Sequence, residues 1–487
     1  MGDRVTATEA PHSADTAYVV GVIALGSVLR LLHLGAPSFW LDEALSVAYA
    51  RMPWTQFVHV MQARELNMLP YYLLLRGWIH LGTGEWIVRS LSAIFSIATL
   101  PLFYRLGARL FGKRAGRIGV LLLALDPYHI RFAQEARSYS LMLLLVTAST
   151  LLFVDATEGS SRSSTRTWVS YVVTAVLAAY THFFAILAIL AHWVSLALVR
   201  PNGVAWKRAA QSAAAICIFL VPIAAFVLLG HADSAEWISK PTVRRVEYLV
   251  YSIMGGDNTS GARLFAYPVY AVVLVAAGAA ARRVWRTPAH ERDVEHLALV
   301  IAGASLPIVL VLAVSVVKPI FVDKYLMECL PFTVLLLAIG VDALRPRALA
   351  YGALFFMLVL SAHGTAEYFR HTDKDDWRSA TRYVFASAHS GDAALFFPRY
   401  TVTPFEYYRA PFDSSATRVA VVYPGILGDG DVGTALSAVR HRYSRLWAVF
   451  NQDGKAGVVV RDSLARRYPL LGDRQFTGVR VLLYDTR

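Results

Sequence analysis

Two short stretches of the chain place carboxylates beside long apolar runs, where chemistry at the edge of a membrane is expected. Asp42 and Glu43 follow the first apolar run, and Glu135 and Arg137 follow a later one, inside the stretch Gln134–Tyr139. A carboxylate in a partly apolar pocket can accept the proton of a hydroxyl group, and a guanidinium offers forked donors that match a phosphate. We therefore predict that Asp42 is a general base oriented by Glu43, and that Arg137 binds a phosphate oxygen.

Both pairs also have structural interpretations, which the sequence leaves open. Asp42 and Glu43 could cap a helix and interact favourably with its dipole. Glu135 and Arg137 could form an ion pair that satisfies two charges near lipid. The functional interpretation is favoured because a tryptophan adjoins the first pair and because the charge topology places both pairs on the same face of the membrane.

Further residues near predicted outer helix ends extend the candidate site. Several cations at such ends would suit a lipid-linked phosphate as leaving group. Histidines there could be general acids, metal ligands or interface anchors, and tryptophans and tyrosines could belong to the interfacial aromatic belt. The additional candidates are Arg89 and Lys324 for the donor phosphate, and Trp40, His129, His182, Tyr139 and Tyr325 for the substrate.

Metal and cysteine chemistry receive little support from the sequence. No spacing of histidines and carboxylates indicates a closed metal site. A single divalent ion, Mg²⁺ or Mn²⁺, bound by Asp42 and Glu135 is left open, and no cofactor is expected to be obligatory. Cys217 and Cys329 are far apart in apolar stretches, so no disulfide framework is indicated.

The composition is that of a polytopic membrane protein. The chain has 487 residues, of which 56% are hydrophobic and only 17% charged, with a mean hydropathy of +0.46, which excludes an ordinary soluble protein. The formal charge of +13 does not indicate nucleic-acid binding, because the arginines are distributed among short loops. Only seven of 47 basic residues are lysines, which favours a GC-rich bacterial genome.

Apolar runs long enough to cross a bilayer predict about eleven transmembrane helices. Every second loop between them is basic, which places those loops and the N-terminus on the cytoplasmic side. The other loops then face outward, including those with Asp42 and Glu135, although loop 231–264 breaks the pattern with Arg244 and Arg245. The predicted spans are 17–35, 86–111, 117–132, 138–155, 168–182, 184–199, 209–230, 265–281, 295–317, 326–343 and 348–366.

Two segments outside the spans are expected to fold. In the loop 36–85, apolar periodicity predicts two short amphipathic helices at the membrane interface, and residues 69–76 form a further interfacial or re-entrant piece. Residues 368–487 have the composition of a soluble domain, separate from the transmembrane domain 1–367. Its expected strands are 394–397, 418–422, 446–450 and 479–484, and its expected helices are 377–388, 432–441 and 457–467, which predicts an α/β domain.

Four motifs, in this order and spacing, give the chain a resemblance to the C-type glycosyltransferases. The branch that it resembles contains the protein O-mannosyltransferases and the lipid A aminoarabinose transferase. The resemblance covers residues 17 to about 367. The motifs are Leu41-Asp-Glu-Ala44, Glu85-Trp-Ile-Val-Arg-Ser-Leu-Ser-Ala93, Leu110-Phe-Gly-Lys-Arg-Ala-Gly116 and Gln134-Glu-Ala-Arg-Ser-Tyr139.

The resemblance implies transfer of a sugar from a polyprenyl-phosphate monosaccharide, on the outer face and with inversion at the anomeric carbon. It implies that Asp42 is the base, that Arg137 contacts the donor phosphate and that Glu135 lies beside the site. One departure is Asn67-Met-Leu-Pro70, where relatives often carry His-Pro-Pro or Lys-Pro. Two C-terminal pieces, Asp376-Trp-Arg378 and Phe405-Glu-Tyr407, look like the periplasmic domain of bacterial relatives, which makes this domain a candidate for acceptor recognition.

The sequence therefore predicts a glycosyltransferase of the bacterial plasma membrane. Its expected donor carries mannose, and its expected acceptor is a glycolipid, glycan or protein of the cell envelope. The rival hypothesis is a transporter or lipid flippase with an outer sensing domain. Transporters place ionisable residues near the bilayer midplane, whereas the informative charges here cluster at predicted outer helix ends.

Overall fold

The computed structural model describes residues 10–158, 164–229, 238–256, 263–287, 291–371, 374–412, 419–422, 442–451 and 455–487. The chain forms two compact units, and each is discontinuous in sequence. The first comprises Met1–Leu34, Pro53–Trp78 and Val88–Arg370, and the second comprises Gly35–Met52, Ile79–Ile87 and His371–Arg487. The second unit thus combines the C-terminal segment with two pieces of the 36–85 loop, and a domain boundary at residue 368 stays a prediction.

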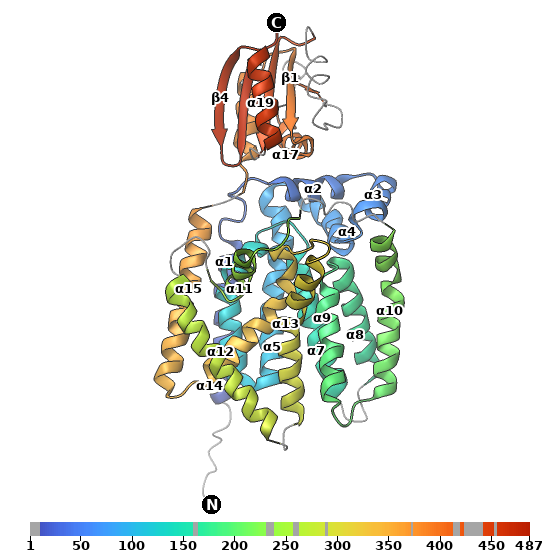
Figure 1. Ribbon diagram of the computed structural model, residues 1–487, viewed down its shortest axis with the longest axis vertical. Coiled ribbons are helices and arrows are strands. Elements are labelled where there is room, and N and C mark those ends of the chain that lie inside the picture. The colour runs from blue at the N-terminus through green and yellow to red at the C-terminus, as the bar shows by residue number, and fades with distance from the viewer. Residues whose placement is uncertain are drawn as a thin grey trace, which may run out of the picture. The chain divides into compact units, whose positions relative to one another are not determined.

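The first unit is helical, and each of the eleven predicted spans contains a helix (Figure 1). Within the described residues, eight helices are long and apolar enough to cross a membrane, so the chain is a multi-pass membrane protein. Its elements are α1 (Ala10–Leu31), α3 (Trp54–Val60), η1 (Met61–Glu65), α4 (Leu69–Trp78), α5 (Glu85–Leu125), α6 (Pro127–Ala133), α7 (Tyr139–Glu158), α8 (Thr165–Thr181), α9 (Ala185–Val199), α10 (Trp206–Leu228), α11 (Val243–Ile253), α12 (Arg263–Arg286), α13 (Glu291–Ser315), η4 (Asp323–Cys329), α14 (Leu330–Ala343) and α15 (Arg347–Arg370).

Glycines explain why α5 accounts for two predicted spans. Gly112 has φ 85° and ψ 163°, a conformation that breaks the helix and that L side chains rarely adopt. A Cβ at Gly116 would lie 2.8 Å from the backbone nitrogen of Ala108, and a Cβ at Gly107 would lie 3.1 Å from the Cα of Gly116. Residues nine apart in one straight helix would be about 13 Å apart. The chain therefore reverses at Gly112, and the motif Leu110–Gly116 is a tight helical hairpin.

The predicted span 117–132 is wrong in one respect, because no single helix covers it. Helix α5 stops at Leu125, and a separate helix α6 begins at Pro127. Asp126 is the N-cap of α6, and its Oδ1 accepts a hydrogen bond from the backbone N–H of His129 at 2.7 Å. A proline at the first helical position and a preceding aspartate are a standard helix start, so Asp126 has a structural role.

Acidic side chains join several basic loops at one end of the bundle. The Arg117 Nε lies 2.5 Å from the Asp15 Oδ1 on α1, and the Arg114 Nε lies 2.7 Å from the Asp342 Oδ1 at the end of α14. Glu158 at the end of α7 pairs with a histidine of α13. These loops therefore meet at the same end of the first unit, as the charge pattern predicts. The compartment that this end faces stays a prediction.

The second unit contains a five-stranded mixed sheet in the order β2-β1-β3-β5-β4. The central strand β3 is parallel to β1, with Leu395 opposite Ala448, and antiparallel to β5, with Ala448 opposite Leu482. The C-terminal segment is thus an α/β fold. The strands are β1 (Asp392–Phe397), β2 (Ala420–Val422), β3 (Arg445–Asn451), β4 (Leu470–Phe476) and β5 (Val479–Asp485).

Helices cover both faces of this sheet. Leu464 of α19 packs with Leu395 and Ala448 on one face, where Figure 1 shows α19 lying along the strands. On the other face, Phe396 contacts Phe405 at a ring separation of 4.8 Å. The helices of this unit are α2 (Leu41–Arg51), η2 (Ile79–Leu81), α16 (Trp377–Ser387), η5 (Arg399–Thr401), α17 (Val402–Arg409) and α19 (Lys455–Arg467).

Most predicted elements of the C-terminal segment are present in the structure. The structure also contains β4 and α17, which the sequence did not predict. Strand β4 lies at the edge of the sheet and is exposed over most of its length, so it lacks the alternation of apolar residues that marks a half-buried strand. The predicted helix 432–441 lies outside the described residues.

Candidate functional site

The turn between α6 and α7 carries Gln134, Glu135 and Arg137, and Gln134 anchors it to the end of α1. The Gln134 Nε2 lies 2.7 Å from the carbonyl oxygen of Leu32 and near two other carbonyl oxygens of the same turn. The Tyr368 hydroxyl donates to the Gln134 Oε1 at 3.2 Å. Because the last carbonyls of a helix need external donors, this amide caps α1 and fixes the turn at once.

Arg137 is buried and held by α4 and α5. Its Nη1 donates to the Tyr72 hydroxyl at 3.0 Å, and its backbone oxygen accepts from the Ser92 hydroxyl at 3.2 Å. The Tyr72 hydroxyl in turn lies 3.5 Å from the Glu65 Oε2. The orientation of the guanidinium is therefore set by surrounding side chains and does not have to be found on ligand binding.

His182 is the C-cap residue of α8, whose last residue is Thr181, and it lies in the connection between α8 and α9. The backbone N–H of Phe183 donates to the Asn67 Oδ1 at 2.8 Å, which ties this connection to the start of α4. The backbone N–H of Phe184 lies 3.4 Å from the His182 Nδ1. Because Nδ1 accepts this hydrogen bond, we assign the ring proton to Nε2.

The Nε2–H of His182 is a buried donor. Only 1% of the residue is exposed, and no hydrogen-bond partner for Nε2 is present among the described residues. Burial, together with the charges of Arg137 and Lys324, lowers the pKa of His182 to about 3. The ring is therefore neutral at physiological pH, and it offers an N–H to an incoming acceptor instead of acting as a general acid.

Four other predicted site residues, Arg137, Tyr139, Lys324 and Tyr325, gather around this ring. The ring centroid of His182 lies 5.0 Å from that of Tyr325 and 5.7 Å from that of Tyr139, and the Lys324 Nζ lies 5.8 Å from the Tyr139 centroid. We call Arg137, His182 and Lys324 the anion cluster. Two cations and one N–H beside aromatic rings suit a phosphate, because charge-assisted hydrogen bonds strengthen where water is excluded.

Two other candidates have structural contacts elsewhere in the first unit. The Arg89 Nη1 donates to the carbonyl oxygen of Leu34 at 3.0 Å. His129 is fully buried, with Nδ1 2.8 Å from the Arg30 Nη2 and Nε2 2.9 Å from the Ser96 Oγ. Because both ring nitrogens of His129 are engaged, these contacts give it a role in packing. Donor or substrate binding by Arg89 and His129 stays a prediction.

Asp42 and Glu43 lie in the first turn of α2, in the second unit. Trp40 is the N-cap residue, and its own side chain makes no capping hydrogen bond, while the charges of both carboxylates favour the N-terminus of α2. Glu43 is fully buried, and its Oε2 lies 3.2 Å from the Lys374 Nζ. Asp42 is only half-buried. Lys374 thus balances the charge of Glu43, and Asp42 is the more accessible carboxylate.

Asp42 and Glu135 belong to different units, so their meeting in one site stays a prediction. Within the part of the chain that the structure describes, no three histidine, cysteine or carboxylate side chains gather closely enough to hold a metal ion. Lys374 already supplies a positive charge beside Glu43. Binding of Mg²⁺ or Mn²⁺ by Asp42 and Glu135 stays a prediction.

Lys374, Tyr72 and Asn67 are contacts that the sequence did not reveal. Lys374 is 331 residues from Glu43 in the chain, so no local spacing connects them. Asn67 could have been noticed, because it begins the piece in which this chain departs from the family pattern. That piece now has a function in the fold, since it holds the connection that carries His182.

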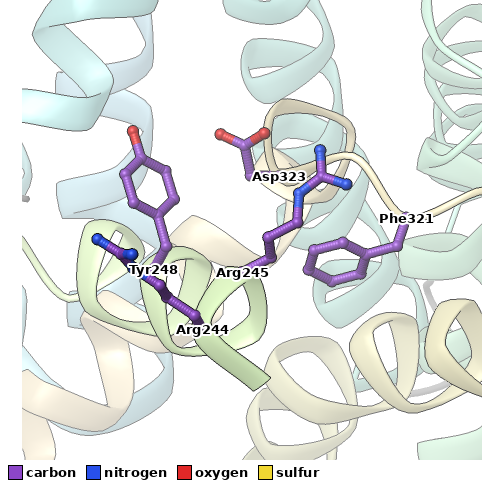
Figure 2. Close-up of a pocket in the computed structure, with 5 residues that line it drawn as sticks. All are labelled: Arg244, Arg245, Tyr248, Phe321 and Asp323. Carbon is purple, nitrogen blue, oxygen red and sulfur yellow. The ribbon is translucent and has the colours of Figure 1, made fainter. Parts of the chain in front are cut away.

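A cavity of about 330 Å³ lies between α11 and the segment that leads into η4. Figure 2 shows Arg244 and Arg245 pointing in different directions from α11, with Asp323 across from Arg245. Tyr248 and Phe321 complete the lining. Asp323 precedes Lys324 in the chain, so the cavity adjoins the segment that supplies one cation of the anion cluster. The unexpected arginines of loop 231–264 therefore line a cavity.

Comparisons with known proteins identify the fold. The model of the family described as dolichyl-phosphate-mannose-protein mannosyltransferase matches residues 68–228. A search of curated proteins finds no significant match. Among solved structures, ArnT from Cupriavidus metallidurans in the apo state is 14% identical, with a TM-score of 0.61 over 96% of this chain and 98% of ArnT.

Two ligand-bound structures are also similar. ArnT bound to undecaprenyl phosphate gives a TM-score of 0.62 at 13% identity, over 96% of this chain and 98% of ArnT. The oligosaccharyltransferase AglB from Archaeoglobus fulgidus, solved with an inhibitory peptide and a dolichol-phosphate, gives 0.53 at 11% identity, over 99% of this chain and 75% of AglB. The chain therefore has the fold of the C-type glycosyltransferases, which confirms the fold expected from its motifs.

Proposed function

We propose that this protein is a membrane glycosyltransferase that uses a polyprenyl-phosphate monosaccharide as donor. The observation that carries the proposal is the anion cluster, in which Arg137, Lys324 and a neutral His182 converge among buried aromatic rings. The fold similarity supports it, because ArnT has been solved with undecaprenyl phosphate. Mannose as the sugar is supported by the description of the matched family model.

The proposed reaction is a single displacement with inversion. The acceptor oxygen attacks the anomeric carbon, the bond from that carbon to the phosphate oxygen breaks, and the phosphate leaves with the electron pair. The Asp42 carboxylate takes the proton of the acceptor hydroxyl. Arg137, Lys324 and the His182 Nε2–H stabilise the charge on the departing phosphate, with Glu135 beside them. Neither a nucleotide nor a metal is obligatory, because positioning and charge stabilisation can supply the rate.

We propose that the reaction takes place on the outer face of a bacterial plasma membrane and that the acceptor is an envelope glycolipid, glycan or protein. The meeting of basic loops at the opposite end of the bundle from the anion cluster supports this orientation. The C-terminal α/β segment would then be extracytoplasmic, where it could contribute to acceptor recognition. Mass spectrometry of envelope lipids and glycans after gene deletion would identify the missing sugar and its attachment point.

One observation keeps the transport hypothesis in view. Glu328 is fully buried at the end of η4, and neither carboxylate oxygen has a hydrogen-bond partner among the described residues. Buried ionisable residues in helical bundles often mark transport paths. A Glu328→Gln variant that abolished movement of a lipid-linked sugar between leaflets, while leaving sugar transfer intact, would favour transport.

The proposed base is tested with Asp42→Asn in reconstituted membranes that contain radiolabelled polyprenyl-phosphate mannose and an envelope extract as acceptor. We expect turnover to fall by about 10²–10⁴-fold, the usual contribution of a general base. The control is Asp15→Asn, at the end of the first unit where the basic loops meet and Asp15 contacts Arg117. Undiminished transfer by Asp42→Asn would exclude Asp42 as the base. If neither the variant nor the wild type forms labelled product, the proposed donor is rejected.

A further inference from the structure

Residues 35–39 lead into α2, and the C-terminal segment forms a hydrogen bond to each of them. Arg378 donates to three successive carbonyl oxygens, and the hydroxyl groups of Ser38 and Tyr408 complete the set. The distances are 3.3 Å from the Arg378 guanidinium to the oxygens of Gly35, Ala36 and Pro37, 2.6 Å from the Ser38 Oγ to the Asp375 oxygen, and 2.6 Å from the Phe39 nitrogen to the Tyr408 hydroxyl.

Arg378 also binds Glu85, which is the first residue of α5 and belongs to the second unit. Its Nε and Nη2 lie 3.0 Å and 2.6 Å from the Glu85 Oε1. The same guanidinium thus joins the entry of the 36–85 loop to its exit. Only arginine has enough N–H donors in a rigid plane to make these contacts together, and a lysine ammonium is a single point of charge.

Tyr408 connects the same two ends of the loop. Its hydroxyl accepts from the backbone N–H of Phe39 and donates to the Glu85 Oε1 at 2.8 Å. The neighbouring Tyr407 donates to the Thr83 oxygen at 2.6 Å, and its ring lies 5.0 Å from the Phe39 ring. The polar atoms of both tyrosines are therefore directed at the loop.

The far end of α2 and the sheet are joined to these contacts. Arg51 is the last residue of α2, and its guanidinium lies 5.5 Å from the centroid of the Tyr407 ring on α17. Helix α17 therefore contacts the end of α2 as well as the residues that precede α2. The Asn451 Nδ2 donates to the Asp375 Oδ2 at 2.9 Å, which links the contact at Ser38 to strand β3. Lys374 adds the ion pair with Glu43. Helix α2 is thus held along its length by one side of the α/β segment.

We propose that Arg378 and Tyr408 are positioning residues that fix α2, and with it the Asp42 carboxylate, in the orientation needed for transfer. The C-terminal segment is then part of the catalytic framework, in addition to any part in acceptor binding. This inference rests on the proposed role of Asp42 as base. A helix is rigid over its first turn, so a shift of residues 38–40 moves Asp42 with it, and a displacement of about 1 Å can cost 10²-fold in rate.

The test uses the full-length protein in nanodiscs with Arg378→Lys and Tyr408→Phe, which keep charge and ring but remove the shared contacts. We expect kcat to fall on the order of tenfold to a hundredfold, with the KM for the donor unchanged, because the anion cluster lies on other segments. A loss confined to KM, or a kcat within twofold of wild type for both variants, would overturn the inference.

Two matched controls separate positioning from general loss of folding. Arg480→Lys breaks a two-point pair of the same kind, since Arg480 contacts Asp473 at 3.0 and 2.7 Å at the edge of the sheet. Tyr484→Phe removes a hydroxyl from the core under α19. We expect both controls to keep wild-type kcat. If they lose as much as the two test variants, the effect is one of domain stability and the positioning role is rejected.

Hydrogen–deuterium exchange gives a readout that does not depend on transfer. We expect peptides covering residues 35–51 to exchange about tenfold faster in Arg378→Lys and Tyr408→Phe, and at the wild-type rate in both controls. We call the contacts of Arg378 and Tyr408 with residues 35–39 and Glu85 the clamp, and unchanged exchange would reject the clamp itself. If Asp42→Asn is fully active while exchange rises as expected, the proposed base has failed and the clamp stands. If Asp42→Asn is inactive while both test variants turn over normally, the positioning role alone has failed.

Discussion

The anion cluster and the carboxylates of α2 are built in different ways. Arg137 and His182 are held by neighbouring elements of one helical unit, through Tyr72 and Asn67. Glu43 is held by Lys374, which follows it by 331 residues, and Phe39 by a side chain 369 residues later. One half of the proposed site therefore depends on packing between membrane helices, and the other depends on contacts between α2 and the C-terminal segment within the second unit.

The difference assigns different sensitivities to the two regions. The contacts around Arg137 are buried among helices, whereas the contacts of residues 35–39 are long-range in sequence and partly exposed at Arg378. Contacts of the second kind open more readily by local unfolding than those of a packed core. We therefore expect changes in the anion cluster to act on donor binding and changes in the clamp to act on turnover alone.

The largest difference between the two regions is expected from a change at Arg137. Arg137→Lys keeps the charge but loses the fork that can hold Tyr72 and a phosphate together, and we expect kcat/KM for the donor to fall about 10²-fold, the scale of a buried charge-assisted contact. Part of this loss should appear in the donor KM, measured with radiolabelled donor in nanodiscs. Arg347→Lys, at the basic end of the first unit, is the control.

Other results for Arg137→Lys would contradict the difference between the two regions. A drop in kcat with no change in donor KM would mean that Arg137 acts like the clamp and does not contact the ground-state donor. Wild-type kinetics would remove Arg137 from the anion cluster altogether.

The sequence singles out candidate residues for the chemistry, whose roles stay predictions, but it does not reveal the framework that holds them. Asp42, Arg137 and Lys324 could be picked out because charged residues beside apolar runs are conspicuous and because short motifs carry them. The partners Lys374 and Tyr408 could not, since their positions relative to α2 are set by the tertiary fold and not by any spacing in the chain. The pieces Asp376-Trp-Arg378 and Phe405-Glu-Tyr407 stand out in the sequence, but as signs of a domain for acceptor recognition and not as contacts of α2.

The fold followed the same rule. Helix positions in the first unit are determined by apolar length, which is local, so each predicted span contains a helix. The break at Asp126 could have been predicted from Pro127, which starts a new helix. The reversal at Gly112 depends on the approach of two helix backbones, and edge strand β4 depends on pairing with β5. Neither of these long-range contacts is encoded in a local period.

The second prediction tests the electrostatic side of the anion cluster. His182→Leu removes the Nε2–H donor, and we expect a loss of about tenfold in kcat/KM for the donor. His182→Gln retains an N–H and should recover most of that loss. The value of kcat/KM for each of the two variants can be measured with the assay used for Arg137→Lys. A glutamine variant as impaired as the leucine variant would show that the ring acts through packing.

The pH dependence of the same residue separates a donor from a general acid. Because the pKa of His182 is lowered to about 3, the ring stays neutral and should not titrate between about pH 5 and 8. We therefore expect wild type and His182→Gln to have pH–rate profiles of the same shape. A folded-state pKa below the ordinary value of 6.5 means that protonation favours the unfolded state. The neutral ring therefore stabilises the folded state fully above pH 6.5, and this stabilisation decreases as the pH falls towards 3.

The smallest effect on activity is expected from the core of the α/β segment, away from α2. Asp392 is fully buried, and it accepts hydrogen bonds from the Arg445 Nε and Nη2 at 2.9 and 2.7 Å and from the Trp447 Nε1 at 2.9 Å. Burial alone would raise the pKa of Asp392, but these donors outweigh it and hold the pKa below its ordinary value of 3.8. The carboxylate therefore stabilises the fold above that value, and the stabilisation is lost as the pH falls through the lowered pKa.

Asp392→Asn should thus lower the free energy of unfolding of the second unit by about 2 kcal/mol, the scale for hydrogen bonds to a charged group. Thermal unfolding followed by tryptophan fluorescence near neutral pH measures this loss, and the difference from wild type should shrink on acidification. Below the unfolding temperature, kcat should be that of wild type, because the contacts of Arg378 and Tyr408 persist while the unit is folded. A marked fall in kcat without unfolding would mean that the sheet core and the clamp act as one element, and the division between stability and positioning would then be lost.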